Sequence, residues 1–302
     1  MRLKTRLKWA VLPIALVSLL SLSGCAAFIP TDVSRGFLPG VPGVTNQTDR
    51  IVNLWNGSWI VLLGVGIVAW GLMAYAAIVY RKRKGDNSIP VQLRYNMPIE
   101  TLFTVIPLIL VVGFFAFTVR DMNAIEQQVT PAHTIQAVGK QWSWDFNYVD
   151  ENTYETGIQS QFAGETGSEK ALPTLWLPVN KAIEFDLTSR DVIHSFWIVD
   201  FLYKKDVFPG RTNKFWVTPQ VESPKDAQGN YIPYKGKCAE LCGEYHSMML
   251  FNVIVSSQAD FDKHMQDLRA QGNAGQLTAD PLDPNNLNRN GNLPGDNPAV
   301  RG

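Results

Sequence analysis

The sequence has few of the residues that bind haem and metals, and it has no net charge. Its 302 residues include three cysteines and four histidines, and 27 basic residues balance 27 acidic ones. A chain without a basic excess gives no support to nucleic-acid binding. The motif C-x-x-C-H is also absent, so the chain has no site for covalently attached haem.

The N-terminus has the pattern of an export signal. Basic residues alternate through the first eight positions, an apolar run follows at residues 9–20, and small residues lead to Cys25. This order predicts a signal peptide over residues 1–24 and a linker at residues 25–50. Leu22-Ser23-Gly24-Cys25 resembles the lipobox of bacterial lipoproteins, which implies a lipid on Cys25. The alternative is an ordinary signal peptide with an incidental cysteine, and both predict an exported N-terminus.

Two long apolar segments follow the linker. Residues 51–80 and 101–119 contain no charged residue, and a bilayer is crossed by about 20 apolar residues. The basic cluster Arg81-Lys82-Arg83-Lys84 lies between them, and the positive-inside rule places it in the cytoplasm. The sequence therefore predicts a two-helix transmembrane hairpin over residues 51–120 of a bacterial plasma-membrane protein. Both termini would lie on the extracytoplasmic side.

The region at residues 130–256 has the composition of an all-β domain. Alternating, β-branched and aromatic residues predict strands at residues 134–138, 142–148, 174–177, 183–187, 195–199, 214–217 and 250–255. Short strands separated by turn residues are typical of a Greek-key sandwich or barrel. Residues 154–172 and 222–231 are predicted to be surface insertions. A helix is predicted at residues 257–271 and a disordered tail, rich in Asn, Gly and Pro, at residues 272–302.

Soft metal ligands are concentrated late in the β region, at Cys238, Cys242, His246 and Met249. Cysteines in an oxidising compartment can form a disulfide, but one that closes so short a loop would add little stability. Thiolate, imidazole and thioether groups suit copper, and His194 on an earlier strand is the candidate for a further ligand. A tetrahedral zinc site from the same cysteines and histidines is the alternative.

The number of cysteines separates two kinds of copper site. A mononuclear blue-copper site uses one cysteine, whereas two bridging cysteines, two histidines and one methionine fit a pair of copper ions. The segment from Cys238 to Met249, CAELCGEYHSMM, closely resembles the binuclear copper (CuA) signature of subunit II of haem–copper cytochrome c oxidases. The hairpin and three further motifs occur in the family's order, namely Pro98-Ile99-Glu100, Gln141-Trp142-Ser143-Trp144, Asp191-Val192-Ile193-His194-Ser195 and Phe208-Pro209-Gly210-Arg211-Thr212-Asn213.

The resemblance covers roughly residues 52–255 and implies a cupredoxin-like Greek-key sandwich with a defined set of ligands. Cys238 and Cys242 would bridge two copper ions, and His194 and His246 would each bind one. Met249 and the backbone carbonyl of Glu240 would be the weak axial ligands. The Glu240 side chain matches the position that binds magnesium at the boundary with the catalytic subunit, and a carboxylate suits that ion.

Two more roles are implied by the resemblance. Trp142 matches the aromatic residue through which electrons arrive from the donor, and Trp144 and Tyr148 either continue that cluster or pack the core. Glu100 matches the glutamate at the mouth of a proton-uptake path, and the alternative is a solvated residue at the membrane surface.

The remaining charged and titratable residues give less specific predictions. An acidic bias at Asp145, Asp150, Glu151, Glu155, Glu165 and Glu169 predicts either a steering surface for a basic donor or a solvated loop. His133 and His264 have no partner at metal-ligand spacing and are expected to be structural.

The function implied by the resemblance is that of the subunit of a terminal oxidase that accepts electrons from a c-type cytochrome. It would pass them to haem in subunit I, where O₂ is reduced to water and protons are pumped. Haems would lie only in partner subunits. The expected partners are subunits I and III, membrane lipids and a cytochrome donor. The donor would be held at the membrane, in some arrangements within a supercomplex. The alternatives are a thioredoxin-type copper chaperone and the copper-free subunit of quinol oxidases.

Overall fold

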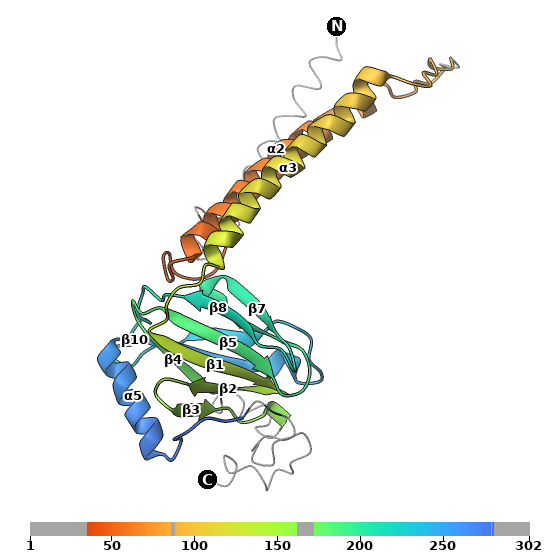
Figure 1. Cartoon of the computed structure of the whole chain (residues 1–302). Coiled ribbons are helices and arrows are strands. Elements are labelled where there is room, and N and C mark those ends of the chain that lie inside the picture. The colour runs from red at the N-terminus through yellow and green to blue at the C-terminus, as the bar shows by residue number, and fades with distance from the viewer. Residues whose placement is uncertain (1–34, 86–87, 162–171, 279, 281–302) are drawn as a thin grey trace.

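Two long helices form a rod that projects from a β domain (Figure 1). The structure is a computed structural model that describes residues 35–85, 88–161, 172–278 and 280. The predicted signal peptide at residues 1–24, Cys25, and residues 281–302 of the predicted tail lie outside the described residues.

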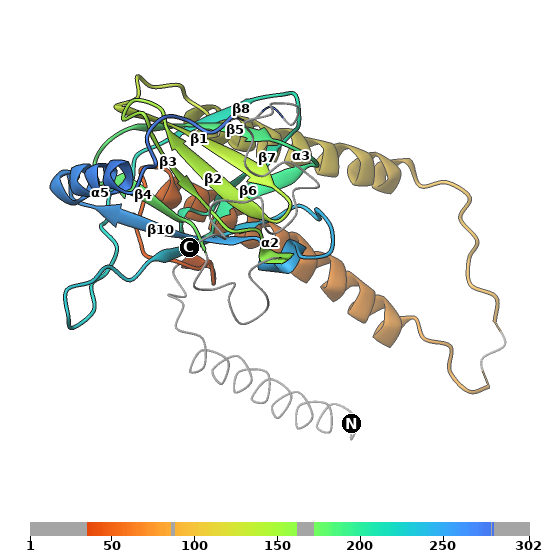
Figure 2. The same cartoon turned by 90° about the horizontal axis from the view of Figure 1, so that it is seen from below.

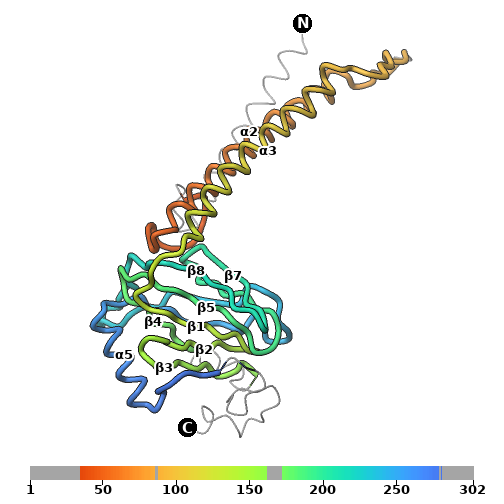
Figure 3. The backbone as a smooth tube through the Cα atoms, in the orientation of Figure 1, coloured from red at the N-terminus to blue at the C-terminus, as the bar shows by residue number. Residues whose placement is uncertain are grey.

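The projecting helices are α2 (Thr48–Val79) and α3 (Met97–Ile125), whose course Figure 3 traces. They overlap in that view, but seen from below they diverge with distance from the β domain (Figure 2). Both helices are long and apolar enough to cross a membrane. Their apolar side chains are exposed on the outside of the pair, as is usual where the surrounding solvent is lipid. The loop between them, which carries the basic cluster, lies at the end of the rod far from the β domain (Figure 1).

The β domain is a sandwich of two five-stranded sheets, with strand orders β3-β2-β1-β5-β8 and β4-β10-β9-β6-β7. The strands are β1 (His133–Lys140), β2 (Ser143–Tyr148), β3 (Thr153–Thr156), β4 (Thr174–Pro178), β5 (Ile183–Ser189), β6 (His194–Ile198), β7 (Tyr203–Val207), β8 (Asn213–Val217), β9 (Tyr234–Cys238) and β10 (Leu250–Ser256). The β1–β5 and β4–β10 pairs are parallel and the others are antiparallel. The predicted combination of a helical hairpin and a β-sandwich is confirmed.

Three strands, β3, β7 and β9, were not predicted from the sequence. Strand β9 reads Tyr-Lys-Gly-Lys-Cys, in which lysine and glycine have low β propensity, yet its side chains alternate between buried and exposed positions. Strand β3 covers the start of the segment 154–172, which was predicted to be a surface insertion, and the last three residues of the strand are partly exposed. Cross-strand pairing with β2 decides its conformation.

Aromatic side chains fill the space between the sheets. The rings of Phe196 and Phe251 stack with centroids 5.0 Å apart, and Trp144 meets both edge-on. Gly236 makes this packing feasible because a Cβ at that position would lie 2.1 Å from the Phe251 ring. Aromatic pairs of this kind contribute about 0.5–1.5 kcal/mol beyond their burial, so they stabilise the packing of the two sheets.

The two helices are attached to the sandwich where α2 begins and α3 ends. The Gln47 amide nitrogen donates hydrogen bonds to the carbonyl oxygens of Ile125 and Trp216, at 2.9 and 2.6 Å. One side chain therefore joins the start of α2, the end of α3 and strand β8. An ion pair between Arg50 and Asp121, 2.9 Å long, adds a second link between the two helices.

The C-terminal part of the β domain differs from the prediction. Helix α5 (Gln258–Ala270) lies at one edge of the sandwich (Figure 2), starts at the Ser257 cap and buries its apolar face as predicted. Residues 272–278, predicted to be disordered, instead lie along β2 and β3. The Asn147 side chain exchanges two 2.8 Å hydrogen bonds with the Leu277 backbone, and Gly275 N donates to Asn152 O. Backbone pairing at a sheet edge does not require apolar side chains, so composition could not reveal it.

Candidate metal centre

The predicted ligands meet where three strands of one sheet begin or end. His194 is the first residue of β6, Cys238 is the last of β9, and β10 begins directly after Met249. Because β6 and β10 are antiparallel to β9, these positions lie at the same end of the sheet. The loop between β9 and β10 supplies the remaining ligands.

The two cysteines are free, and their sulfur atoms lie 3.8 Å apart. His194 Nδ1 lies 3.8 Å from Cys238 Sγ, and His246 Nδ1 lies 3.4 Å from Cys242 Sγ. The donor atoms of His194, Cys238 and Cys242 are all within 4.8 Å of one another. The two thiols therefore stand between two imidazoles, and each thiol has its own histidine.

Two weaker donors complete the group. The Glu240 carbonyl oxygen lies 3.2 Å from Cys238 Sγ, and Met249 Sδ lies 3.8 Å from Cys242 Sγ. A 3₁₀ turn, η4 (His246–Met248), explains why Met249 and His246 approach the same sulfur. Side chains three residues apart eclipse one another in such a turn. All six predicted donors are brought together.

The cluster is buried, and burial affects its protonation. His194 and Met249 are inaccessible to solvent, and Cys238 and Cys242 are 5% and 3% exposed. A hydrogen bond from Cys242 lowers the pKa of Cys238 to about 3, against the opposing effect of burial. The same sulfur–sulfur contact raises the pKa of Cys242. A metal that binds both sulfurs would displace any proton that remains on them.

The chemistry of these donors fits copper. Thiolate, imidazole and thioether groups are the ligands that soft copper ions prefer. His194, Cys238, Cys242 and Met249 are buried, and His246 is partly exposed. Magnesium and calcium need several oxygen ligands, and the cluster offers one backbone carbonyl.

Comparison with known proteins identifies the family. The family model "Cytochrome C oxidase subunit II, periplasmic domain" matches residues 133–257. A protein of Streptomyces avermitilis named "Probable cytochrome c oxidase subunit 2" is 43% identical over 265 residues, which cover 78% of this chain and 80% of that protein. The chain belongs to the cytochrome c oxidase subunit 2 family.

Other members of the family agree. A Streptomyces coelicolor protein with the same name is 41% identical over 264 residues and covers 78% of this chain and 80% of its own length. Among solved structures, the periplasmic domain of subunit II of the Bradyrhizobium japonicum oxidase is 28% identical. It covers 48% of this chain and 99% of its own length with a TM-score of 0.40. The family model and the two Streptomyces relatives confirm the predicted membership of the subunit II family, and the family model covers the β domain.

Trp142 lies against the ligand loop. Its indole Nε1 donates to the Cys242 carbonyl oxygen at 3.2 Å, and the Gln141 amide donates to the same oxygen at 2.7 Å. The ring is half-buried and packs on Tyr245, with centroids 5.1 Å apart. The contacts of Gln141 and Tyr245 were not predicted, because no spacing rule connects the β1–β2 turn to a loop a hundred residues later. Trp144 and Tyr148, by contrast, are fully buried in the core.

His194 is held from two sides. A Cβ on Gly139 would lie 2.8 Å from His194 Cδ2, so glycine allows β1 to approach the imidazole. On the other side, Asp191 Oδ1 lies 2.7 Å from His194 Nε2. Burial opposes a charge on His194, but the hydrogen bonds with Asp191 and Cys238 outweigh it and raise its pKa. Asp191 stood in a recognised motif, but the sequence assigned it no role.

The other predicted site residues lie away from the sulfur atoms. The Glu240 side chain is exposed, while its carbonyl faces Cys238. Glu100 is at the start of α3, at the far end of the rod, where its carboxylate accepts a 2.9 Å hydrogen bond from Asn96 N. His133 bonds to Glu151, and His264 stacks on Trp176 with its pKa lowered to about 4 by burial.

Some of the acidic residues that were predicted to form a surface are not exposed to solvent. Asp145 is fully buried between Lys140 and Arg190. Glu155 is also largely enclosed, and burial raises its pKa to about 7. A steering role for Asp145 is therefore wrong, since a fully buried carboxylate presents no charge to an approaching protein. Glu165 and Glu169 lie outside the described residues.

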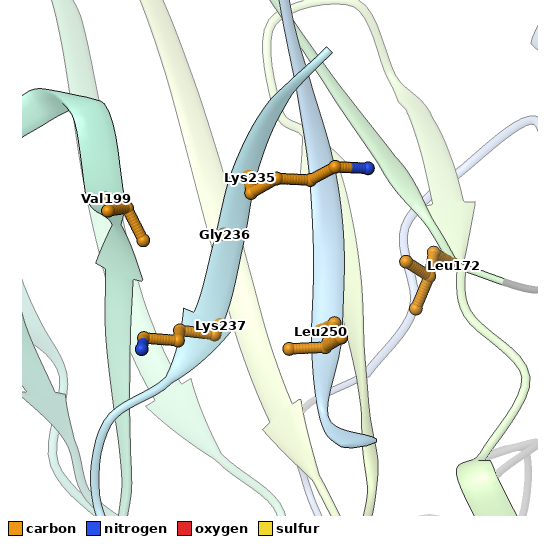
Figure 4. A pocket seen from close by; sticks show the side chains of 6 residues that line it. All are labelled: Leu172, Val199, Lys235, Gly236, Lys237 and Leu250. Carbon is orange, nitrogen blue, oxygen red and sulfur yellow. The ribbon is translucent and has the colours of Figure 1, made fainter. Parts of the chain in front are cut away.

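A shallow pocket of about 380 Å³ on the second sheet lies outside the cluster. It is lined by Leu172, Val199, Lys235, Gly236, Lys237 and Leu250 (Figure 4). These residues supply two ammonium groups and apolar surface, but no thiol, imidazole or carboxylate. The metal chemistry belongs to the ligand loop and not to this pocket.

Proposed function

We propose that this chain is the subunit of a haem–copper terminal oxidase that accepts electrons from a c-type cytochrome. It passes them to haem in subunit I, where O₂ is reduced to water and protons are pumped. The observation that supports this proposal is the buried group of two free thiols between two imidazoles, in a chain of the subunit 2 family. The chain would not reduce O₂ alone, because haem and the catalytic copper belong to its partners.

The six donors would hold two copper ions. These donors are the thiols of Cys238 and Cys242, the imidazoles of His194 and His246, the Met249 thioether and the Glu240 carbonyl. A thiolate-bridged copper pair accepts and releases one electron with little change in bond lengths. The chain's contribution is to hold the donors rigidly and to exclude water, and the stacked aromatic core below the loop supports both. A single zinc ion would leave Met249 and the carbonyl without a role.

Copper content and electron paramagnetic resonance (EPR) of the purified oxidase test this proposal. The purified oxidase also contains the catalytic copper of subunit I, so we expect three copper ions per complex. Two of them would be held by this chain and would share one unpaired electron. Cys242→Ser should abolish that spectrum, because it removes one of the two bridging sulfurs. Cys25→Ser is a suitable control, since it changes the third cysteine and should leave the copper signal intact. One copper with a blue-copper spectrum, or zinc alone, would refute the proposal.

The remaining partners follow from the same proposal. The exposed Glu240 carboxylate would bind magnesium at the boundary with subunit I. A lipid on Cys25 would anchor the exported N-terminus at the same membrane face as the β domain. The electron donor would be a separate c-type cytochrome, held at the membrane and in some assemblies joined to the oxidase in a supercomplex with subunits I and III.

Glu100 would open a proton-uptake path on the cytoplasmic side. Glu100→Gln should slow O₂ consumption several-fold and leave the EPR spectrum of the copper pair unchanged. The substituted amide keeps an oxygen that can accept the hydrogen bond from Asn96 N, so the start of α3 should be preserved. Turnover equal to that of the wild type would show that Glu100 is only a solvated capping residue.

A further inference from the structure

We infer that Asp191 is a positioning residue that fixes both the copper ligand His194 and the backbone that carries Trp142. This inference rests on the proposed function. Asp191 lies in the loop between β5 and β6, and its side chain is only 4% exposed. A buried carboxylate must be fully hydrogen-bonded, so its partners define what it holds in place.

One oxygen of the carboxylate orients the histidine. Asp191 Oδ1 lies 2.7 Å from His194 Nε2, and a carboxylate can only accept a hydrogen bond, so the proton resides on Nε2. The lone pair of the imidazole is then on Nδ1, the nitrogen that faces Cys238 Sγ. Asp191 thus selects which nitrogen is available to a metal, as carboxylates commonly do for metal-binding histidines.

The other oxygen holds the β1–β2 turn. Asp191 Oδ2 accepts a 2.6 Å hydrogen bond from the Gln141 backbone nitrogen. Gln141 and the next residue, Trp142, both donate to the Cys242 carbonyl. A single carboxylate therefore joins the histidine on one side of the cluster to the tryptophan that contacts the cysteine on the other side.

The carboxylate is itself held in a fixed direction. Val192 N donates to Asp191 Oδ1 at 2.7 Å. The Ser189 hydroxyl accepts from Asp191 N at 3.2 Å and donates to Val192 O. The loop is thus closed on itself at Asp191, which limits the freedom of the carboxylate before any metal binds.

Asp191→Asn keeps the size of the side chain but replaces one hydrogen-bond acceptor with a donor and removes the negative charge. Both oxygens of Asp191 face N–H groups, so the nearly isosteric amide must place its NH₂ against His194 or against Gln141. We expect copper retention against a chelator to weaken roughly 10- to 100-fold, the range found for outer partners of metal-binding histidines. The EPR spectrum and the reduction potential should change, and reduction by the cytochrome donor should slow.

The experiment compares wild type, Asp191→Asn and Asp191→Ala in the oxidase purified from membranes. Asp186→Asn is the matched control, because it removes the same charge from β5, where Asp186 pairs with Lys214. Chelator titration, the EPR spectrum, the copper potential and stopped-flow reduction at low and high salt are measured on each. The control should resemble wild type in the chelator titration, spectrum and potential.

The inference fails if both Asp191 variants keep the wild-type spectrum, potential and chelator resistance. A slowing of donor reduction that disappears at high salt, with these properties unchanged, would mean that Asp191 only steers the donor. Failure of Asp191→Asn to assemble would also contradict the inference, because it would assign the carboxylate to folding. A wild-type oxidase without the two-copper signal would instead refute the proposed function.

Discussion

Replacing Asp145 with asparagine should destabilise the β domain by about 3–5 kcal/mol, the cost of removing one partner from a buried ion pair. Asp145 is inaccessible to solvent and binds Lys140 Nζ at 2.6 Å and Arg190 at 2.5 Å. An asparagine would leave two buried cations without a counter-charge. The melting temperature of the full-length protein should fall by about 10 °C or more.

The pH dependence of the free energy of unfolding provides a second measurement. Burial opposes ionisation of Asp145, but Lys140 and Arg190 outweigh it and lower its pKa below the usual 3.8. A lowered pKa in the folded state means that the stabilisation is complete above pH 3.8 and is lost as the pH falls toward the folded-state pKa. The stability difference between wild type and Asp145→Asn should therefore shrink at acid pH.

An exposed ion pair provides the control for Asp145. Lys263 and Asp267 are four residues apart on α5, and their side chains are 70% and 50% exposed. Asp267→Asn should change stability by about 0.5 kcal/mol or less. Equal effects of the two substitutions would show that the Asp145 network is solvated in the protein and does not carry the predicted energy.

Trp142→Phe should slow reduction of the copper pair by the cytochrome donor, by a larger factor than any other substitution outside the ligand set. Phenylalanine keeps an aromatic ring against Tyr245 but cannot donate a hydrogen bond to the Cys242 carbonyl, so the direct contact between residue 142 and the backbone of a proposed copper ligand is lost. The ligands themselves are untouched, and the EPR spectrum and copper content should be retained. Stopped-flow absorption measures the rate of reduction.

Trp144→Phe is a matched control for that experiment. Trp144 is fully buried in the core, and its indole nitrogen has no hydrogen-bond partner among the described residues. The substitution should lower stability through lost packing, but it should leave donor reduction near the wild-type rate. A Trp142→Phe protein that is reduced as fast as wild type would show that electrons arrive by another route.

The cluster of donor side chains could be predicted because most of its members are local in the sequence. Five of the six donors lie within the twelve residues from Cys238 to Met249, where spacing alone indicates soft-metal chemistry. His194 is distant, but its motif and its place on a predicted strand identified it. The hairpin was equally accessible, because uninterrupted apolar segments of bilayer length are typical of membrane-spanning helices.

Strand β2 shows why other features could not be predicted. Its alternation assigns Trp144, Phe146 and Tyr148 to one face and Asp145 and Asn147 to the other, and the acidic bias predicted that Asp145 would be at the surface. All six residues of the strand are buried. Arg190 covers the second face at Asp145, and the backbone of residues 272–278 covers it at Asn147. Alternation indicates which residues share a face, but not whether a distant segment covers that face.

The sequence by itself determined the membrane hairpin, the kind of domain that follows it and the chemical identity of the ligands, because these depend on local spacing and side-chain type. Only the tertiary structure decided that Asp145 neutralises two buried cations, that residues 272–278 pair with the sheet edge, and that Asp191 joins His194 to the turn before Trp142. Each of these is a directional hydrogen bond or ion pair between segments that meet only when the sandwich closes. The energies of these interactions depend on burial and on relative orientation, and neither can be deduced from residue type or sequence spacing.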